Sequence, residues 1–271
     1  MARLIRWIRG RGIAYQIIKI ILLLVVAVAT VSVAAWIGNP HTNHAGGGEQ
    51  RPTAWTAPPE RFGTTDPPLP SGFPSMEFPP PMIQAPKGSP QPVPTRYGLT
   101  YSVPGNADWR PSNTMVTGWT NEVSHERIAT FGAVSDYGYG YCREHDGSAL
   151  ANIGVHGRTG VDLEQAARED VDKARLIFSD ETGGRTPEVT VDGPVRFTIS
   201  GRPAIRFTAR LSGVPQKYSC DPTRVDYDII ATPAYSSAET AVFMIEHHLG
   251  LPKSLSDKDI DALIDSLRKT T

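Results

Sequence analysis

The sequence predicts an α+β fold, in which an antiparallel sheet is flanked by two main helices, preceded by a transmembrane helix and a disordered proline-rich linker. Three observations predict it: an uncharged apolar run near the N-terminus, a proline-rich stretch after it, and a C-terminal part with many strand-like segments and two helix-like ones. These observations divide the chain into a basic tail (1–19), a transmembrane helix (20–37), a linker (38–95) and an α+β domain (96–271).

The run Ile20–Ile37 holds 18 residues without a charge. As a helix it would be about 27 Å long, close to the ~30 Å hydrocarbon core of a bilayer. Arginines and Lys19 precede it and no acidic residue does, so the positive-inside rule predicts a cytoplasmic N-terminus and an extracytoplasmic domain. A cleaved secretory signal is the alternative, because 27–29 and 32–34 have the small-x-small form that signal peptidase accepts. Both alternatives place the domain outside the cytoplasmic membrane.

The predicted linker is defined by its prolines, since 15 of the 24 in the chain lie between Asn39 and Thr95. Proline fixes φ and lacks an N–H donor, so neither helices nor inner strands propagate through such a stretch. We therefore expect a disordered spacer with polyproline-like patches that holds the domain away from the membrane.

Period-two alternation predicts the strands of the domain. The predicted strands are 97–103, 114–119, 128–135, 150–155, 188–192, 195–200, 204–211, 225–232 and 240–247. Glycines on alternate positions predict a loop or bulged strand at 137–142. Asp192-Gly193 and Ser200-Gly201 indicate turns between consecutive strands.

Two segments show helical spacing instead. The first begins after Asp162, a good N-cap, and carries an apolar stripe from Leu163 to Phe178. The second follows Ser256, which forms a capping-box pattern with Asp259, and its stripe is Ile260, Leu263, Ile264 and Leu267.

Cys142 and Cys220 are the only cysteines. In an oxidising compartment, two well-separated cysteines in one domain favour a disulfide, and the alternative is two buried free thiols. Two cysteines do not make a metal site, and no histidine stands at a usual spacing from both, so no metal or cofactor is expected. A net charge of −1 without a dense basic patch argues against a nucleic-acid partner.

Several sequence features together suggest a family. They are Tyr97–Pro104, Trp109, Tyr141-Cys142, the helix with Ala166-Ala167, Cys220-Asp221-Pro222, Thr240–Phe243, and the closing segment Leu255–Ile260 with Ser266–Arg268. This pattern resembles an uncharacterised extracytoplasmic domain of actinobacterial single-span membrane proteins, which looks like the PsbP-type α-β-α sandwich. The resemblance covers 96–271 and implies that the paired cysteines belong to the family pattern. It brings no catalytic residue, and PsbP-like domains act mainly as adaptors and binding modules.

Aromatic residues are the best binding candidates. Trp109, Trp119, Tyr137 and Tyr139 lie among glycines in the first half of the domain, together with Tyr141. Aromatic rings on such loops can stack on sugars or hold an apolar side chain of a partner. The alternative is that the tryptophans seal the edge of the core and the tyrosines pack beside the disulfide.

The histidines give weaker signals. His247 and His248 are neighbours on a predicted strand, so they face opposite sides and cannot chelate one ion. Ser124-His125-Glu126 places three catalytic residue types side by side, but a working triad needs convergence in space. His145, between Glu144 and Asp146, fits either a weak metal site or a polar loop.

Three functions remain open from the sequence. The first is a non-catalytic, membrane-anchored domain that binds a protein or another component of the cell envelope. The second is a hydrolase acting on wall material with His125, Glu126 or His145. The third is a structural envelope protein without a dedicated ligand.

Overall fold

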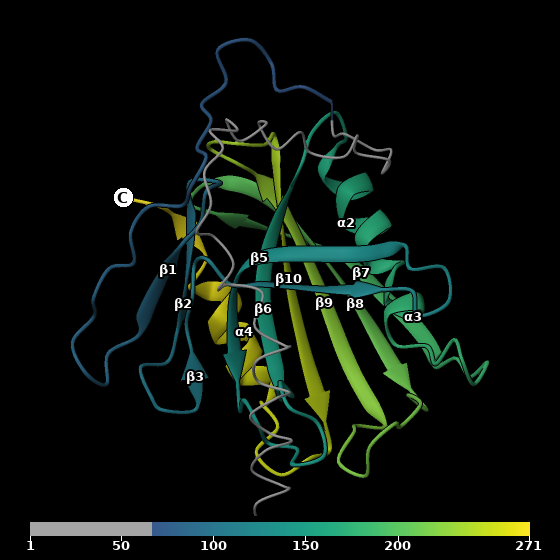
Figure 1. The fold of residues 1–271 in the computed structure, drawn as a ribbon. Coiled ribbons are helices and arrows are strands. Elements are labelled where there is room, and N and C mark those ends of the chain that lie inside the picture. The colour runs from purple at the N-terminus through teal and green to yellow at the C-terminus, as the bar shows by residue number, and fades with distance from the viewer. Residues whose placement is uncertain (1–66) are drawn as a thin grey trace, which may run out of the picture. The chain divides into compact units, whose positions relative to one another are not determined.

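The computed structural model describes residues 67–271 (Figure 1). The predicted cytoplasmic tail, the transmembrane helix and the linker as far as residue 66 lie outside the described residues. Between 67 and 271, none of the helices combines the length and the apolar character that crossing a bilayer requires.

An antiparallel sheet of eight strands forms the centre of the domain, in the order β3-β5-β6-β10-β9-β8-β7, and β4 also pairs with β5. Its strands are β3 (Trp109–Arg110), β4 (Val116–Thr120), β5 (Arg127–Tyr137), β6 (Ala151–Arg158), β7 (Glu188–Ile199), β8 (Arg202–Ser212), β9 (Arg224–Pro233) and β10 (Thr240–Leu249). A second sheet of three strands has the order β1-β2-β11. These strands are β1 (Gln91–Pro94), β2 (Leu99–Val103) and β11 (Arg268–Lys269).

The helices between residues 67 and 271 are short. They are α2 (Leu163–Val171), α3 (Ala174–Ile177) and α4 (Asp257–Asp265). Asp162 caps α2 by accepting a hydrogen bond from the backbone N–H of Gln165 at 2.8 Å. Ser256 and Asp259 form a capping box at the start of α4. Both predicted helix starts are therefore confirmed.

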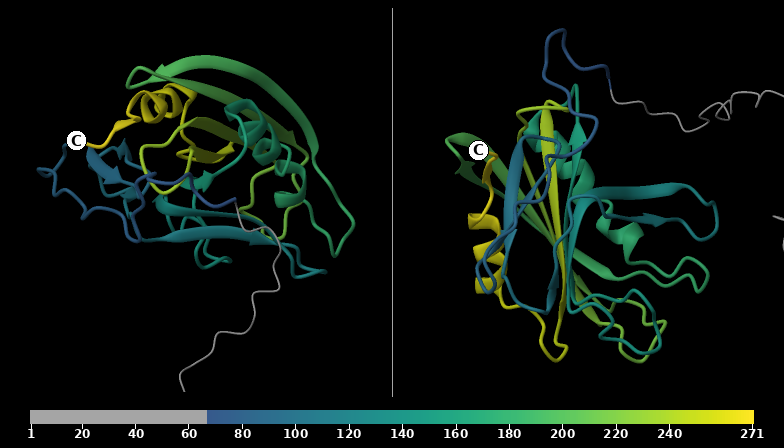
Figure 2. Two further views of the ribbon diagram at one scale, coloured as in Figure 1. Left: turned by 90° about the horizontal axis from the view of Figure 1, so that it is seen from above. Right: turned by 60° about the vertical axis from the view of Figure 1, so that its left-hand side comes forward.

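One face of the large sheet is covered by α4 and the small sheet, as the right-hand view of Figure 2 shows. The core on this side holds Tyr101 of β2, Phe243 and Ile245 of β10, and Ile260 and Leu263 of α4, all buried. The apolar stripe of α4 thus meets the alternate residues of β10 that point to this side.

The opposite face is covered by α2 and α3. Ala166, Ala167 and Val171 of α2 pack on Tyr227 of β9 and Met244 of β10, among other residues of this core. Small alanines bring the helix close to the sheet. The two cores share the strands of the large sheet, so β9 and β10 are buried on both faces.

The predicted α-β-α sandwich with two main helices is wrong. About 40% of the described residues lie in strands and 11% in helices, so the domain is β-rich. Two causes are visible. The first helical stripe is broken at Asp172 and Lys173 into α2 and the four-residue α3, and α4 shares its side of the sheet with three strands.

One of those strands, β1, comes from the segment expected as linker. Residues 91–94 pair antiparallel with 100–103 of β2, although two of the four are prolines. Proline is tolerated on an edge strand, and β1 is the edge of its sheet. Upstream of β1, the backbone N–H of Met76 donates to the Ser237 hydroxyl at 2.8 Å. The backbone N–H of Ser237 in turn donates to the Pro74 carbonyl at 2.8 Å. This proline-rich segment therefore lies against the domain.

The turn predicted at Asp192-Gly193 is also wrong. The two segments on either side of it belong to the single strand β7, whose register with β8 shifts between Asp192 and Val195. Gly193 has a φ of 116°, which residues with a side chain rarely adopt. The glycine therefore accommodates a bulge within the strand.

A buried carboxylate joins α2 to the large sheet. Asp170 is fully buried, and its oxygens accept hydrogen bonds from His156 of β6 at 2.6 Å and from Lys173 at 2.5 Å. Burial alone would raise the pKa of Asp170, but the hydrogen bond and charge of His156, together with Lys173, outweigh it and lower the pKa to about 2.

We predict that Asp170 makes folding stability fall in acid. Its folded pKa of about 2 lies below the ordinary aspartate value of 3.8, so the contribution to stability is complete above pH 3.8 and is lost as the pH falls toward 2. It amounts to roughly 2 kcal/mol. In denaturant titrations, Asp170→Asn should be less stable than the wild type at pH 7, and the difference should shrink below pH 4. A stability difference that stays constant down to pH 2 would contradict this prediction. The control is Asp192→Asn, which removes an exposed ion pair with Arg210 and should change stability little at any pH.

A second prediction compares two buried tyrosines. The Tyr101 hydroxyl donates to the Ala133 carbonyl at 2.6 Å and bonds to Ser135, whereas the Tyr227 hydroxyl is buried and without a partner among the described residues. Tyr101→Phe should lower the free energy of unfolding by about 1–3 kcal/mol, because it leaves buried partners unpaired. Tyr227→Phe should leave it unchanged or raise it. Equal losses for the two variants in denaturant titrations would refute the difference in pairing.

Candidate functional site

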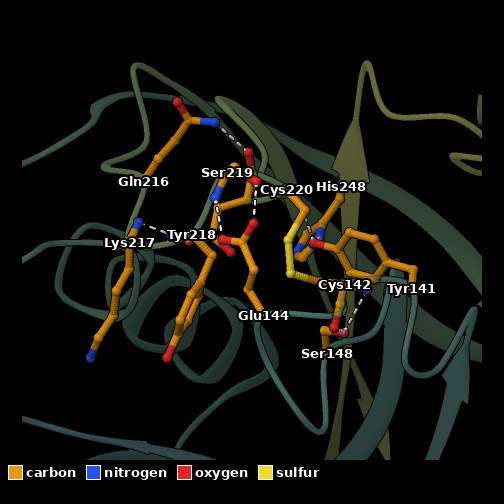
Figure 3. The surroundings of a disulfide bond; sticks show 11 residues. Tyr141, Cys142, Glu144, Ser148, Gln216, Lys217, Tyr218, Ser219, Cys220 and His248 are labelled. Carbon is orange, nitrogen blue, oxygen red and sulfur yellow. Dashed lines mark hydrogen bonds between the residues drawn. A yellow bond between two sulfur atoms is a disulfide. The ribbon is translucent and has the colours of Figure 1, made fainter. Parts of the chain in front are cut away.

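Two long loops meet at one end of the large sheet and are joined by the disulfide between Cys142 and Cys220 (Figure 3). Cys142 lies in the loop between β5 and β6, and Cys220 in the loop between β8 and β9. Their Cα atoms are 5.7 Å apart. The predicted disulfide is therefore confirmed.

Hydrogen bonds reinforce the junction. The Glu144 carboxylate accepts from the hydroxyl of Ser219 at 2.6 Å and from its backbone N–H at 3.0 Å. These two bonds lower the pKa of Glu144, so the carboxylate is charged at neutral pH. The ring of His145 stacks on that of Tyr218 with 5.0 Å between centroids. The two loops thus form one continuous wall.

This wall bounds an open cleft of about 600 Å³. The start of the β8–β9 loop extends this wall. The other walls come from β4 and from the residues that follow α3, and residues of β6 and β10 also line the cleft. The lining residues include Thr117, Trp119, Glu122, Tyr141, His145, Asn152, Phe178, Asp180, Arg185, Lys217, Asp221, Glu246 and His248. A concave site of this size is in the range that proteins use for small ligands.

Three polar side chains meet where β6 and β10 line the cleft. Glu246 and His248 are two residues apart on β10 and share a face, and Asn152 lies opposite Glu246 on β6. The Glu246 carboxylate is bonded by the His248 ring at 3.1 Å and by the Asn152 amide at 3.3 Å. Glu246 is only 6% exposed, so a carboxylate is held in a largely water-free place at the edge of a cleft.

Tyr141 links this group to the disulfide. Its hydroxyl donates to the backbone carbonyl of Cys220 at 3.3 Å and lies 3.4 Å from Nδ1 of His248. Burial, followed by the charges of Asp221 and Glu246, raises the pKa of Tyr141 to about 12. The phenol therefore stays neutral at physiological pH and acts as a hydrogen-bonding group.

The four predicted aromatic residues do not form one cluster, although two of them are in contact. Trp109 is buried against Tyr137, with 5.2 Å between ring centroids, on the side of α4. Tyr139 is 47% exposed and lies under the guanidinium of Arg110. Trp119 alone of the four lines the cleft, where it makes edge-on contacts with Phe131 and Tyr227. A binding role for Trp109, Tyr137 and Tyr139 stays a prediction.

The histidines are equally dispersed. His125 and Glu126 lie exposed between β4 and β5, outside the residues that line the cleft, whereas His145 is one of those residues. His247 points away from the cleft and is buried with Asp228, 3.7 Å from its carboxylate. Within 67–271, no group of three or more histidine, cysteine, aspartate or glutamate residues is arranged to hold a metal ion.

Sequence reasoning missed Asn152, Glu246 and His248. The signal was present in Glu246-His247-His248, because strand alternation separates the two histidines and puts Glu246 with His248. The partner Asn152 needed the register of β6 against β10, which pairs residues 94 positions apart.

We predict that the disulfide stabilises both the domain and the cleft. It joins residues 78 apart, which in the chain-entropy model stabilises the fold by at most about 4–5 kcal/mol. Replacing Cys142 and Cys220 together by alanine should lower the free energy of unfolding by about 2–4 kcal/mol. Amide hydrogen exchange should rise in residues 138–150 and 213–223 more than in β9. Unchanged exchange in both loops would contradict this role.

Comparison with known sequences assigns the domain to a family. Residues 84–271 match the family model described as a domain of unknown function, DUF8017. No curated protein matches the chain. Because the match spans more than half of the chain, the protein belongs to the DUF8017 family.

Proposed function

We propose that this protein is a membrane-anchored, non-catalytic binding protein of the cell envelope, whose extracytoplasmic domain holds an envelope component in the cleft beside the disulfide. The observation that carries the proposal is the cleft itself. It combines a volume of about 600 Å³ with an aromatic ring, Trp119, and with the polar group of Asn152, Glu246 and His248. A concave surface with a few convergent polar groups is the usual form of a ligand site.

The disulfide supports the extracytoplasmic placement. Disulfides persist in oxidising compartments and are rare in the cytosol. The uncharged run Ile20–Ile37 with arginines before it supports the anchor. Residues 38–66, which hold four prolines and the run Gly46-Gly47-Gly48, suit a spacer between the membrane and the domain.

A hydrolase acting on wall material is the second candidate, and a specific arrangement favours it. The His248 ring lies between the Glu246 carboxylate and the Tyr141 hydroxyl, an order in which a carboxylate can orient an imidazole for proton transfer. On this hypothesis Glu246 and His248 replace His125 and Glu126 as the reacting groups. We rank it second because no serine, threonine or cysteine nucleophile is bonded to His248 among the described residues.

The proposal predicts the effect of filling the cleft. Thr117 and Val116 are neighbours on β4 and point to opposite faces, and of the two only Thr117 lines the cleft. Thr117→Trp should abolish retention of the bound component, whereas Val116→Trp should not, because Val116 is 63% exposed outside the cleft.

The measurement uses the full chain in mild detergent, immobilised and exposed to fractionated envelope extract, with the retained material identified by mass spectrometry. A component retained by the wild type and Val116→Trp but not by Thr117→Trp supports the proposal. Identical retention by all three proteins refutes it. Turnover of the retained component that Glu246→Gln abolishes would favour the hydrolase instead.

A further inference from the structure

We propose that the cleft recognises its ligand through a positively charged amino group, which Glu246 holds. This inference rests on the proposed function, because it names the chemistry of the ligand for the same cleft. It is carried by the charges that line the cleft, by the contacts of each charged side chain and by the rings around them.

The lining of the cleft is negative. Its acidic residues are Glu122, Asp180, Asp221 and Glu246, and its permanently basic residues are Arg185 and Lys217. An excess of carboxylates in a concave site attracts cations and repels phosphate and carboxylate ligands.

The two cations of the lining are already paired. The Arg185 guanidinium makes two bonds to one Asp180 oxygen, at 2.7 and 3.2 Å. The Lys217 ammonium lies 3.5 Å from Glu122, close to the open rim. Little positive charge is left to receive an anionic ligand.

Glu246 differs from the other carboxylates of the cleft. Asp180 and Glu122 have cationic partners, and Asp221 accepts from the backbone N–H groups of Lys217 and Tyr218 at 2.8 and 2.7 Å. The contacts of Glu246 are an amide and an imidazole, and no lysine or arginine between 67 and 271 pairs with it. A buried carboxylate without a permanent counter-charge is stabilised when a cation binds beside it.

Aromatic rings complete the chemistry. Trp119, Phe178 and Tyr141 all line the cleft, and the first two meet the ring of Tyr227, which lies opposite Glu246 on β9. Ammonium groups are attracted to aromatic faces, and partial removal of water strengthens this attraction. One carboxylate among aromatic rings therefore suits an amino group better than a phosphate.

The test uses two probes that differ in one charge. Nα-acetyl-lysine amide carries the ammonium, and Nα,Nε-diacetyl-lysine amide is its neutral counterpart. Saturation-transfer difference NMR on the full chain in detergent should show binding of the first, with an affinity at least tenfold higher than that of the second. Raising the salt concentration should weaken the binding. N,N′-diacetylchitobiose and N-acetyl-glutamate serve as the neutral-sugar and anionic probes.

The variant Glu246→Gln keeps the shape and removes the charge. It should reduce the affinity for the ammonium probe at least tenfold, while Glu188→Gln, which removes the same charge from an exposed position on β7 outside the cleft, should change it less than twofold. Thermal unfolding of both variants checks that they are folded. If Glu246→Gln does not fold, the comparison of the two lysine probes on the wild type still decides the question.

The outcomes separate this inference from the proposed function. Equal affinity for both lysine probes, or no binding of either, overturns the inference. If chitobiose binds and Thr117→Trp abolishes that binding, the cleft is a ligand site and only the amino-group chemistry is wrong. If the component retained from envelope extract is also retained by Thr117→Trp, the proposed function itself fails.

Discussion

Burial of β10 on both faces is the constraint on which the rest of the structure depends. Ala241, Phe243 and Ile245 enter the core beneath α4, and Val242 and Met244 enter the core beneath α2. Strand alternation continues this division past the end of the apolar segment. The side chains of Glu246 and His248 therefore point to the face of the sheet that α2 covers, and they line the cleft. The side chain of His247 points to the face that α4 covers and is buried near Asp228.

The same constraint explains why the cleft is polar where it meets the sheet. The Glu246 carboxylate is almost fully buried and has little contact with water, so neighbouring side chains must donate the hydrogen bonds that it needs. Asn152 and His248 do this from β6 and from β10 itself. Apart from β4, the cleft walls have a different origin, because they are mainly loops, and the disulfide with Glu144 and Ser219 fixes two of these loops against each other. A rigid sheet thus carries the polar group, and tied loops shape the space around it.

Sequence patterns predicted most of the local structure. Period-two alternation located the long strands, and side-chain capping located the starts of α2 and α4, because these signals are local. They failed where distant segments decide the outcome. The α-β-α sandwich was wrong because β1, β2 and β11 share a face with α4, and the turn at Asp192-Gly193 was wrong because β8 pairs on both sides of it.

The site was less predictable than the fold. The disulfide followed from the number of cysteines and their expected compartment. Trp119 was identified as an aromatic candidate, but the sequence could not show that Trp109 and Tyr137 lie on the other side of the sheet. Asn152, Glu246 and His248 form a group only through the pairing of β6 with β10.

The most direct test of this account is the orientation of the two adjacent histidines. Nuclear Overhauser spectra of the full chain, with labelled histidine and tyrosine rings, would measure it. Because the ring centroids of His248 and Tyr141 are 6.1 Å apart, we expect contacts between these two rings and none between the rings of His247 and Tyr141. Contacts from His247 to Tyr141, with none from His248, would mean that the side chains of β10 point to the opposite faces of the sheet. Glu246 and His248 would then not line the cleft, and the assignment of the cleft would be wrong.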